Sequence, residues 1–435
     1  MVIFSNGLPS ATNEMFLRTE LDYTTRFTSR LHLVPFALMK EKQGVDCLPD
    51  GIDVHEPVVK RSLFFWAGMC LRLPLVIGIF RKDLLCLRRL SVAIVQKIII
   101  SLYRAATVAT WLDTNAALIG SAEILYFYWA DKASLMIPFI RRRYGWAHHI
   151  VVRAHGFDLD EERAGGYLPL RQEIFGGTNV VAPISELGAS WITGRYGIQS
   201  SKVVVSRLGV KPIEVSWKSD RNTPGQSESL RIVSCALAVP LKRLDIVARA
   251  VIEMQIAVEW THIGDGPEIH TLRRLIADSQ TPQKVLFCGA LPNSQVRRLL
   301  ATGGFHYFVS ASASEGVPVS MMEAMSAGIP IVTTKAGAVE EIVDQTNGFL
   351  IGVDTNHKEY AELLLHAASI QCRDYLDMST SALRSWKNKF DADTNYEEFY
   401  RSVILSCRDS VTDPTCEKIS KNIPKTHGNS TEDGP

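Results

Sequence analysis

Short apolar runs alternate with segments of helical periodicity along most of the chain. Segments of the first half with the pattern of buried strands are Val2–Ser5, Ile124–Tyr128, Ile150–Ala154, Val180–Pro183 and Val203–Ser206. One helix is predicted from about Asn13, and another over Glu186–Tyr196, where Ser185 is a good N-cap. Strands that alternate with helices indicate βαβ units, and therefore a parallel sheet with right-handed crossovers.

The same alternation restarts after Lys218–Glu228, a polar segment with proline, glycine and no apolar periodicity, which is typical of a linker. The strands predicted beyond it are Leu230–Cys235, Ile256–Ile263, Val285–Cys288, His306–Ser310 and Ile329–Thr333. The helices predicted between them are Leu241–Met254, Ile269–Ala277, Ser294–Thr302 and Val319–Ala327. Ligands of open α/β sheets bind beyond the carboxyl ends of the strands, so two facing halves place an active site in the cleft between them.

This alternation divides the chain into domains of an α/β fold, each a doubly wound parallel sheet. We predict an N-terminal Rossmann-like domain at 1–212, a linker at 213–229 and a C-terminal Rossmann-like domain at 230–384. Residues 385–408 are predicted as a C-terminal helix that crosses back to the N-terminal domain. Residues 409–435 have few large apolar side chains, which predicts a disordered tail.

Composition excludes several classes of protein. Of the 435 residues, 46% are hydrophobic and 21% are charged, which rules out wholesale disorder and a collagen-like chain. The 47 Lys and Arg against 46 Asp and Glu leave a net charge of +1, whereas a general nucleic-acid binder is clearly basic. The eight cysteines form no CxxC pair, so reduced thiols in a cytosolic protein are expected rather than disulfides or a zinc site.

The charge is unevenly distributed along the chain. Pro57–Val108 holds nine basic residues against Asp83 alone, a local charge of +8, so the other residues sum to −7. Within it, Leu63–Phe80 is long enough to cross a bilayer, but Arg72 and Pro74 lie at its centre. A central arginine costs about 2.5–3.5 kcal/mol on insertion, which disfavours a transmembrane helix. Two interpretations stay open: basic helices on an anionic membrane surface, and ordinary domain helices with solvated charges.

The most informative chemical motif is the window 312–330, SASEGVPVSMMEAMSAGIP. Glu315 and Glu323 are separated by seven residues, and Gly316 and Pro318 between them predict a tight turn before a helix. Free N–H groups at the start of a helix bind phosphate or sugar oxygens. The two carboxylates can therefore accept hydrogen bonds from different sets of hydroxyls. The alternative is one capping glutamate and one exposed helix glutamate.

This window resembles the signature of retaining glycosyltransferase family 4, which has the GT-B fold. Further segments of the second half match that family in order and spacing: GDGP at 264–267, FCGALPN at 287–293, GAVEE at 337–341 and NGFL at 347–350. In the first half, three segments resemble exopolysaccharide and capsule members: the stretch 8–17, YFYW at 126–129 and RAHGFD at 153–158. The resemblance covers most of residues 230–352 and parts of the first half.

The resemblance assigns the donor site to the C-terminal domain. Glu315 would contact the donor sugar ring, and Glu323 would bind the ribose hydroxyls of the nucleotide. Lys242 matches the lysine that binds the diphosphate, where a positive charge stabilises the departing nucleoside diphosphate. Further donor-binding positions are Arg243, Gly264, Gly316, Val317, Pro318 and Val319.

The acceptor site is assigned to the N-terminal domain. His155 matches the histidine near the reacting sugar, so the implied catalytic residues are His155, Lys242 and Glu315. Asp158 and Glu14 are the implied acceptor-side residues. In one respect the chain departs from the family: Ala236 and Leu237 stand where a Gly-Arg pair usually holds the diphosphate. Either the remaining groups suffice, or diphosphate binding is weakened.

The implied reaction is sugar transfer with retention at the anomeric carbon, in which the leaving diphosphate takes the acceptor proton. It needs no enzyme nucleophile, metal or cofactor. The implied partners are a nucleotide-sugar donor, a lipid-linked saccharide or growing polysaccharide, and an anionic membrane surface bound through 57–108, with no nucleic acid. Such an enzyme is expected in the cytoplasm, peripheral on the inner membrane. The alternatives are a nucleotide-binding scaffold, a nucleotide-sugar epimerase and, less favoured, a glycoside hydrolase, which needs two carboxylates flanking one bond.

Overall fold

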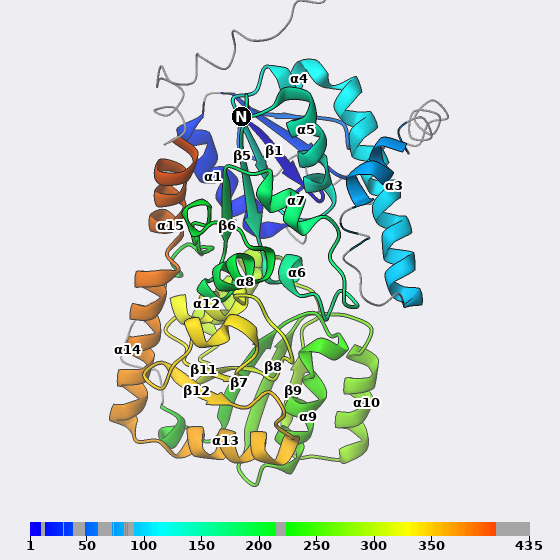
Figure 1. Cartoon of the computed structure of the whole chain (residues 1–435). Helices are drawn as coiled ribbons and strands as arrows, with labels where there is room; N and C mark the ends of the chain where they lie inside the picture. Colours follow the sequence, from blue (N-terminus) through cyan, green and yellow to red (C-terminus); the bar gives the residue numbers. More distant parts are fainter. Residues whose placement is uncertain are drawn as a thin grey trace, which may run out of the picture.

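The computed structural model describes residues 1–9, 14–28, 30–37, 48–59, 72, 74–81, 83, 85, 91–214 and 223–405. The predicted tail at 409–435, much of the basic segment before residue 91, and 215–222 of the predicted linker lie outside these residues. Figure 1 shows two α/β halves, one above the other, with α14 (Cys372–Lys389) and α15 (Ala392–Phe399) along one side of both.

The first half is a six-stranded parallel sheet in the order β3-β2-β1-β4-β5-β6, the order of a Rossmann fold. Its strands are β1 Val2–Ser5, β2 Leu31–Pro35, β3 Ile52–Val54, β4 Ile124–Phe127, β5 His149–Ala154 and β6 Val180–Pro183. Its helices are α1 Met15–Phe27, α3 Val92–Thr114, α4 Ala116–Gly120, η2 Lys132–Met136, α5 Ile137–Tyr144, α6 Gly156–Leu159, α7 Arg171–Gly176, α8 Glu186–Tyr196 and η3 Ser200–Lys202.

The second half repeats this topology, with the order β12-β11-β10-β7-β8-β9. Its strands are β7 Leu230–Cys235, β8 Val258–Ile263, β9 Lys284–Phe287, β10 Tyr307–Ser310, β11 Ile331–Thr334 and β12 Gly348–Ile351. Its helices are η4 Pro224–Gln226, η5 Pro240–Lys242, α9 Leu244–Glu253, α10 Ile269–Ser279, α11 Asn293–Thr302, α12 Val319–Ser326, η6 Gly337–Glu341, α13 His357–Ser369 and α14. The predicted α/β class with two parallel sheets is therefore confirmed.

β4 and β6 are unbroken apolar runs, as expected for strands of a parallel sheet that is covered on both faces. In β1, Val2 and Phe4 belong to the core on one face, whereas Ile3 belongs to the core on the other. β1 lies inside its sheet, where Ile3 pairs with Leu33 of β2 and with Tyr126 of β4. Alternate side chains thus supply two separate cores, as the period of a strand requires.

Among the predicted strands and the helices between them, two differ from the structure by more than two residues at an end. The segment predicted as a strand at Val203–Ser206 forms a single bridge to Val181 and is not a strand, because it only skirts the edge of the sheet at β6. The helix predicted from Leu241 begins at Leu244. Residues 240–242 form a 3₁₀ turn, and Arg243 has a left-handed backbone with φ 44°, which separates that turn from α9.

The chain crosses between the halves twice, and the two crossings lie side by side. The main-chain N–H of Val210 donates to the Phe390 oxygen (2.9 Å), and that of Ala392 donates to the Val210 oxygen (3.2 Å). A Cβ on Gly209 would lie 2.4 Å from the Cα of Ala392, so this close approach requires glycine. The predicted domain limits stay predictions. The observed crossing nevertheless places α14 against the second half and α15 against the first.

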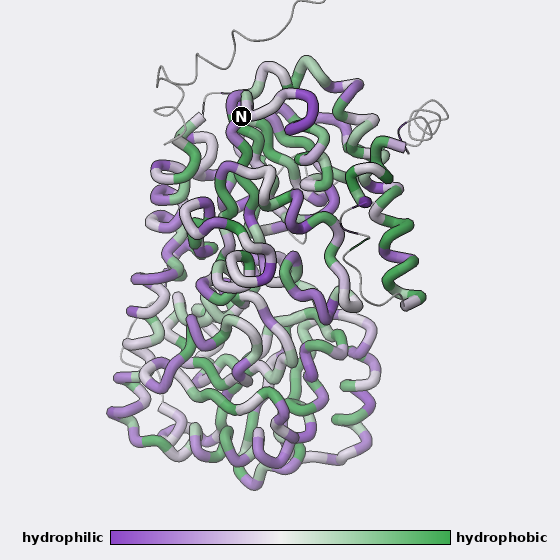
Figure 2. Tube along the Cα trace, in the orientation of Figure 1, coloured by the Kyte–Doolittle hydropathy of each residue, from purple (hydrophilic) through white to green (hydrophobic). Residues whose placement is uncertain are grey.

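One helix of the described residues, α3, is long and apolar enough to span a membrane on length and composition alone. About 39% of its most apolar stretch is buried within the protein, and its second half packs against η2 and the sheet. Figure 2 shows its hydrophobic residues continuing to the outer end of the helix.

Candidate active site

A cavity of about 450 Å³ lies between the two halves, at the carboxyl ends of both sets of strands. His155, Gly156 and Asp160 line it from the first half, and Glu315 and Gly316 line it from the second. The halves touch at its edge: a Cβ on Gly156 would lie 2.6 Å from the Cα of Gly316. The cleft predicted between two facing sheets is therefore present, and glycines allow its walls to meet.

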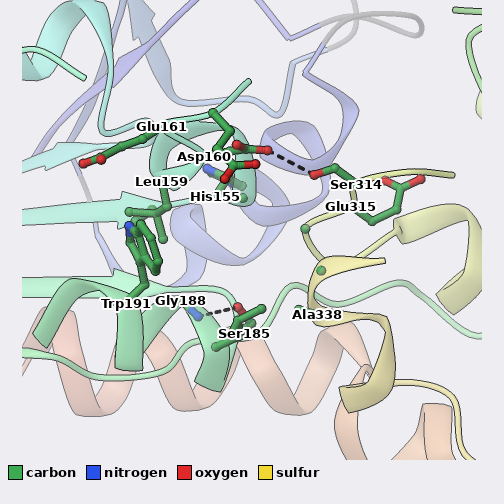
Figure 3. A pocket seen from close by; sticks show the side chains of 16 residues that line it. His155, Leu159, Asp160, Glu161, Ser185, Gly188, Trp191, Ser314, Glu315 and Ala338 are labelled. Carbon is green, nitrogen blue, oxygen red and sulfur yellow. Dashed lines mark hydrogen bonds between the residues drawn. The ribbon is translucent and has the colours of Figure 1, made fainter. Parts of the chain in front are cut away.

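A direct hydrogen bond also joins the halves at this cleft. Ser314 Oγ donates to Asp160 Oδ2 at 3.0 Å. Figure 3 shows these two side chains facing each other, with Glu315 next to Ser314.

Lys242 and Glu315 form an ion pair in the second half, with 2.5 Å between Lys242 Nζ and Glu315 Oε1. Lys242 follows β7 and Glu315 follows β10, and these strands are neighbours in the sheet. Because parallel neighbours end at the same edge, their following loops meet there. The two side chains are only partly exposed, and together with Cys235 and Pro318 they line a small cavity. The sequence-predicted sugar and diphosphate residues are thus in contact.

Glu323 is buried on α12, unlike the exposed helix glutamate of the alternative interpretation. Its Oε1 accepts a hydrogen bond from Asn293 Nδ2 at 2.6 Å. Burial raises the pKa of Glu323, and the Asn293 hydrogen bond and the charge of Arg297 act in the opposite direction. The binding of ribose hydroxyls by Glu323 stays a prediction. Glu315 caps no helix, since Pro318 is the N-cap of α12 and its side chain makes no capping bond.

The turn between the two glutamates leaves main-chain donors free. Within the described part of the chain, the N–H groups of Gly316, Val317 and Val319 make no hydrogen bond. The side chains of Val317 and Val319 are buried in the core, which anchors the turn. Gly337 supports it from behind: with φ +59°, a Cβ there would lie 1.9 Å from the Glu315 oxygen. These donors fit the predicted anion-binding helix start.

Gly264 packs against the loop in which the chain departs from the family. With φ +142°, a Cβ on Gly264 would lie 1.9 Å from the Ala236 oxygen. Leu237, in place of the usual arginine, is 59% exposed. Arg243 points elsewhere, since its Nε donates to the Ala311 oxygen at 2.7 Å and burial lowers its pKa. Donor binding by Gly264 and Arg243 stays a prediction, and the cation observed beside Glu315 is Lys242.

His155 is held rigidly at the start of α6 in the first half. Its main-chain N–H donates to Asp158 Oδ2 (2.9 Å), and its Nδ1 lies 3.5 Å from the same oxygen. Its ring centroid is 4.1 Å from that of Trp129. Burial lowers the pKa of His155, which favours the neutral ring at pH 7. Asp158 is fully buried and orients His155. His155 lines the cavity, whereas Asp158 does not.

Glu14 is linked to His155 through Trp129. Glu14 Oε1 accepts hydrogen bonds from Trp129 Nε1 and from the main chain of Asn6, both at 2.9 Å. Burial raises the pKa of Glu14 to about 7, although these hydrogen bonds and the charge of Lys132 act against the rise. The predicted acceptor-side residues therefore form one connected group around His155.

The sequence reasoning missed several residues at the cleft. Trp191 on α8 lines the cavity and is partly exposed, and Asn293 positions Glu323. Glu341 accepts hydrogen bonds from the main chain of Glu186 (3.0 Å) and Leu187 (2.9 Å), across the interface. Asn293 and Glu341 stand at the ends of the matching segments 287–293 and 337–341, so position in those segments was the available signal. Trp191 had no such signal.

Comparison with known families agrees with this architecture. Residues 230–369 match the family described as glycosyl transferases group 1. The matched residues include the predicted donor residues Lys242, Glu315 and Glu323.

Two curated relatives narrow the comparison. The chain is 30% identical over 206 residues to WcaL of Escherichia coli (strain K12), named for glycosyl transfer in colanic acid biosynthesis; the match covers 45% of this chain and 50% of WcaL. It is 26% identical over 223 residues to the amylovoran biosynthesis glycosyltransferase AmsK of Erwinia amylovora, covering 48% of this chain and 53% of AmsK. The alignments thus span about half the length of these relatives.

Solved structures show the same fold over more than nine tenths of the chain. The lipopolysaccharide outer core galactosyltransferase WaaB matches with a TM-score of 0.65 and 16% identity, covering 92% of this chain and 99% of WaaB. Anabaena Alr3699/HepE in complex with UDP and glucose matches with a TM-score of 0.62 and 16% identity, covering 93% and 99%. The predicted GT-B fold is therefore confirmed.

Proposed function

We propose that the protein is a retaining, metal-independent glycosyltransferase that moves a sugar from a nucleoside-diphosphate sugar to a lipid-linked saccharide or growing polysaccharide. The observation that carries the proposal is the cavity that His155 and Glu315 line from opposite halves, with Lys242 bound to Glu315. The group 1 domain and the relatives named for exopolysaccharide biosynthesis support it. UDP bound in the structure of Alr3699/HepE supports a nucleotide-sugar donor.

In this proposal the Lys242–Glu315 ion pair exchanges partners when the donor binds. The diphosphate takes the place of Glu315 beside Lys242, and the free N–H groups at Gly316, Val317 and Val319 donate to donor oxygens. Glu315 is then free to accept hydrogen bonds from sugar hydroxyls. Positive charge at Lys242 stabilises the diphosphate most when the bond to the sugar breaks, because negative charge develops there.

The reaction balances without an enzyme nucleophile. The bond between the anomeric carbon and the diphosphate oxygen breaks, and the acceptor oxygen attacks the same face of the sugar. The acceptor proton passes to the departing diphosphate. His155 is held beside the cleft with a neutral ring and contributes a hydrogen bond to the reacting sugar.

The second candidate is a nucleotide-binding scaffold with little activity. It is favoured by one observation, the exposed Leu237 where the family usually has an arginine for the diphosphate. A hydrolase has no comparable support, because Glu315 and Glu323 belong to the same half and only Glu315 lines the cavity between the halves. No observation specifically favours an epimerase.

The test is nucleotide release from a panel of UDP- and GDP-sugars, with membranes that carry acceptor and with EDTA present. We expect turnover, and we expect Lys242→Met and Glu315→Gln each to lower kcat about 100-fold or more, as removal of one charge-stabilising group typically does. Lys335→Met is the matched control, because Lys335 also forms an ion pair, with Glu340 at 3.0 Å, in the same half.

Two outcomes would contradict the proposal. Wild-type rates in Lys242→Met would remove the donor-site assignment. Tight nucleotide binding without release of nucleotide from any donor would favour the scaffold. Loss of turnover in EDTA alone would remove the metal-independent part and leave the transfer reaction in place.

A further inference from the structure

A second cavity, of about 570 Å³, lies within the first half. Five cationic side chains line it, together with one carboxylate, Asp131: Lys97, Arg104, Lys132, Arg163 and Arg171. Trp129 and Phe157 also line it, whereas His155 and Gly156 line the cavity between the halves. The two cavities thus lie on either side of the same short segment.

These cations are poorly compensated. Arg104 Nη1 is 3.9 Å from Asp131 Oδ1, and no other ion pair to the five is found within the described residues. Lys97 Nζ donates to the main-chain oxygen of Ala164 at 2.6 Å, which supplies no charge. With one carboxylate against five cations, the lining carries a net charge of +4.

Arg171 shows that the site is built into the fold. It is 3% exposed, its Nε donates to the main-chain oxygen of Asp158 (2.9 Å), and its Nη1 donates to the main-chain oxygen of Pro169 (3.4 Å). Its Nη2 has no partner among the described residues. A guanidinium that is held by the main chain and has a free donor at a cavity is suited to bind an anion there.

The cations also repel one another. Burial lowers the pKa of Lys97, and the charges of Arg171 and Arg104 lower it further, whereas Asp131 acts in the opposite direction. A ligand with two or more negative charges relieves this repulsion. The number of cations and the volume of the cavity suit a diphosphate better than a single phosphate.

Helix α3 connects this cavity to an exposed apolar surface. Lys97, Ser101 and Arg104 form its cavity face, one turn apart. The neighbouring face bears five exposed apolar or aromatic side chains: Val92 (77% exposed), Val95, Ile99 (61% exposed), Ile100 and Tyr103. Figures 1 and 2 show this helix at the outer edge of the first half, with hydrophobic residues along it.

We propose that this basic cavity binds the diphosphate of a saccharide joined to a lipid through diphosphate, while the lipid chain lies along the exposed apolar face of α3. The inference rests on the proposed function, because it assigns the acceptor of that reaction. Trp129 lies between the basic cavity and the transfer site: it lines the cavity, and its ring centroid is 4.1 Å from that of His155. A saccharide attached to the bound diphosphate therefore begins beside the transfer site.

The experiment measures binding of geranylgeranyl diphosphate in neutral detergent micelles to the full chain. Inorganic diphosphate, geranylgeraniol and vesicles of phosphatidylglycerol are the comparison ligands. We expect Lys97→Gln and Arg104→Gln each to weaken binding about tenfold, as loss of one charge-assisted hydrogen bond does. Lys97→Arg should retain most of the affinity, and Arg142→Gln, an exposed arginine of the same half, should not change it.

The comparison ligands separate the sources of the anion. Tighter binding of geranylgeranyl diphosphate than of geranylgeraniol or inorganic diphosphate supports the proposal. Equal binding of inorganic diphosphate, or equal competition by phosphatidylglycerol vesicles, would overturn the lipid-diphosphate assignment. Unchanged affinity in the folded double variant of Lys97→Gln and Arg104→Gln would overturn the site.

Nucleotide release by the wild type separates this inference from the proposed function. If the wild type releases nucleotide from donors but does not bind geranylgeranyl diphosphate, the inference fails and the proposed function stands. If it binds geranylgeranyl diphosphate but neither binds nor releases nucleotide, the proposed function fails, and the role of this ligand as acceptor fails with it.

Discussion

The fully buried Arg153 shows how single residues hold the first half together. Its Nη2 lies 3.2 Å from Glu20 Oε2, and its Nε donates to the hydroxyl of Tyr126 at 2.7 Å. The hydroxyl of Tyr400, near the C-terminal end of the described chain, reaches Glu20 Oε1 at 3.3 Å. Removing one partner would leave an uncompensated buried charge, which typically costs 3–5 kcal/mol. Arg153 and Tyr126 of the family segments are thus buried within the first half and do not line the cavity between the halves.

Glu14 provides a prediction at the same scale. Its pKa is raised from 4.5 to about 7 in the folded chain. Between those values the folded chain keeps a proton that the unfolded chain has released, so the free energy of unfolding falls as the pH rises. We expect the free energy of unfolding of Glu14→Gln not to show this fall. Relative to the wild type, it should rise by about 1–3 kcal/mol between pH 4 and pH 8. Urea unfolding across that range measures it.

The difference between the two unfolding curves isolates Glu14 from other titrating groups. Glu214→Gln, which removes an exposed carboxylate, is the control and should run parallel to the wild type. A Glu14→Gln curve that also runs parallel would show that Glu14 has an ordinary pKa.

Among the elements, α8 is capped partly by its own half and partly by the other. Ser185 Oγ accepts from the N–H of Gly188 at 3.0 Å, while Glu341 of the second half accepts from Glu186 and Leu187. Arg207 Nη2, at 3.4 Å, also pairs with Glu341. A carboxylate at a helix N-terminus is favoured by the free N–H groups and the helix dipole. The N-terminus of α8 is therefore capped in part across the interface between the halves.

This cap predicts a shift in domain closure. Glu341→Ala removes the acceptor of both N–H groups, so the open form should become more populated and small-angle scattering should give a larger radius of gyration. We expect the closed form to lose about 1 kcal/mol of stability relative to the open form, which is roughly a fivefold change in the equilibrium between the two forms. Glu340→Ala, the exposed neighbour paired with Lys335, is the control. Equal radii for both variants and the wild type would show that the cap does not hold the halves together.

At the scale of the whole molecule, the C-terminal segment joins the two cores. Trp386 of α14 is buried in the core of the second half, and Tyr396 and Phe399 of α15 are buried in that of the first. Tyr396 also accepts a hydrogen bond from the N–H of Gly209 in the other crossing, at 3.3 Å. Both crossings are thus fastened where they pass each other, which sets the hinge between the halves.

Tyr396→Ala should weaken the contact of α15 with the first half and with Gly209. Truncation of a buried aromatic side chain costs about 3–5 kcal/mol, and the loss should fall on the first half. We expect calorimetry to show the first half unfolding at a lower temperature, ahead of the second. Tyr396→Phe keeps the ring and should lose only about 1 kcal/mol. A single unshifted transition in Tyr396→Ala would show that α15 does not stabilise the first half.

The positions of the strands could be predicted from the sequence because the signal is local. Val180–Pro183 is predicted residue for residue, since a strand buried on both faces appears as an unbroken apolar run. Leu230–Cys235 is also predicted residue for residue, although Arg231 and Ser234 interrupt its apolar run. The start of α9 could not, because the left-handed backbone at Arg243 has no signature in the pattern. The spacing of Glu315 and Glu323 left two interpretations open, and the resemblance to a known family assigned their donor roles.

The sequence by itself determined two parallel α/β halves and the donor motif, because apolar periodicity and short spacings are properties of neighbouring residues. Only the tertiary structure decided what meets across long distances. Glu341 caps a helix that begins 155 residues earlier, and Lys97 shares a cavity with Arg171. The charge of +8 over Pro57–Val108 did not predict that basic residues of this segment line a cavity with Arg171. Lys97 and Arg104 reach that cavity because the apolar face of α3 packs against the sheet, and this packing fixes the direction in which the other faces of the helix point.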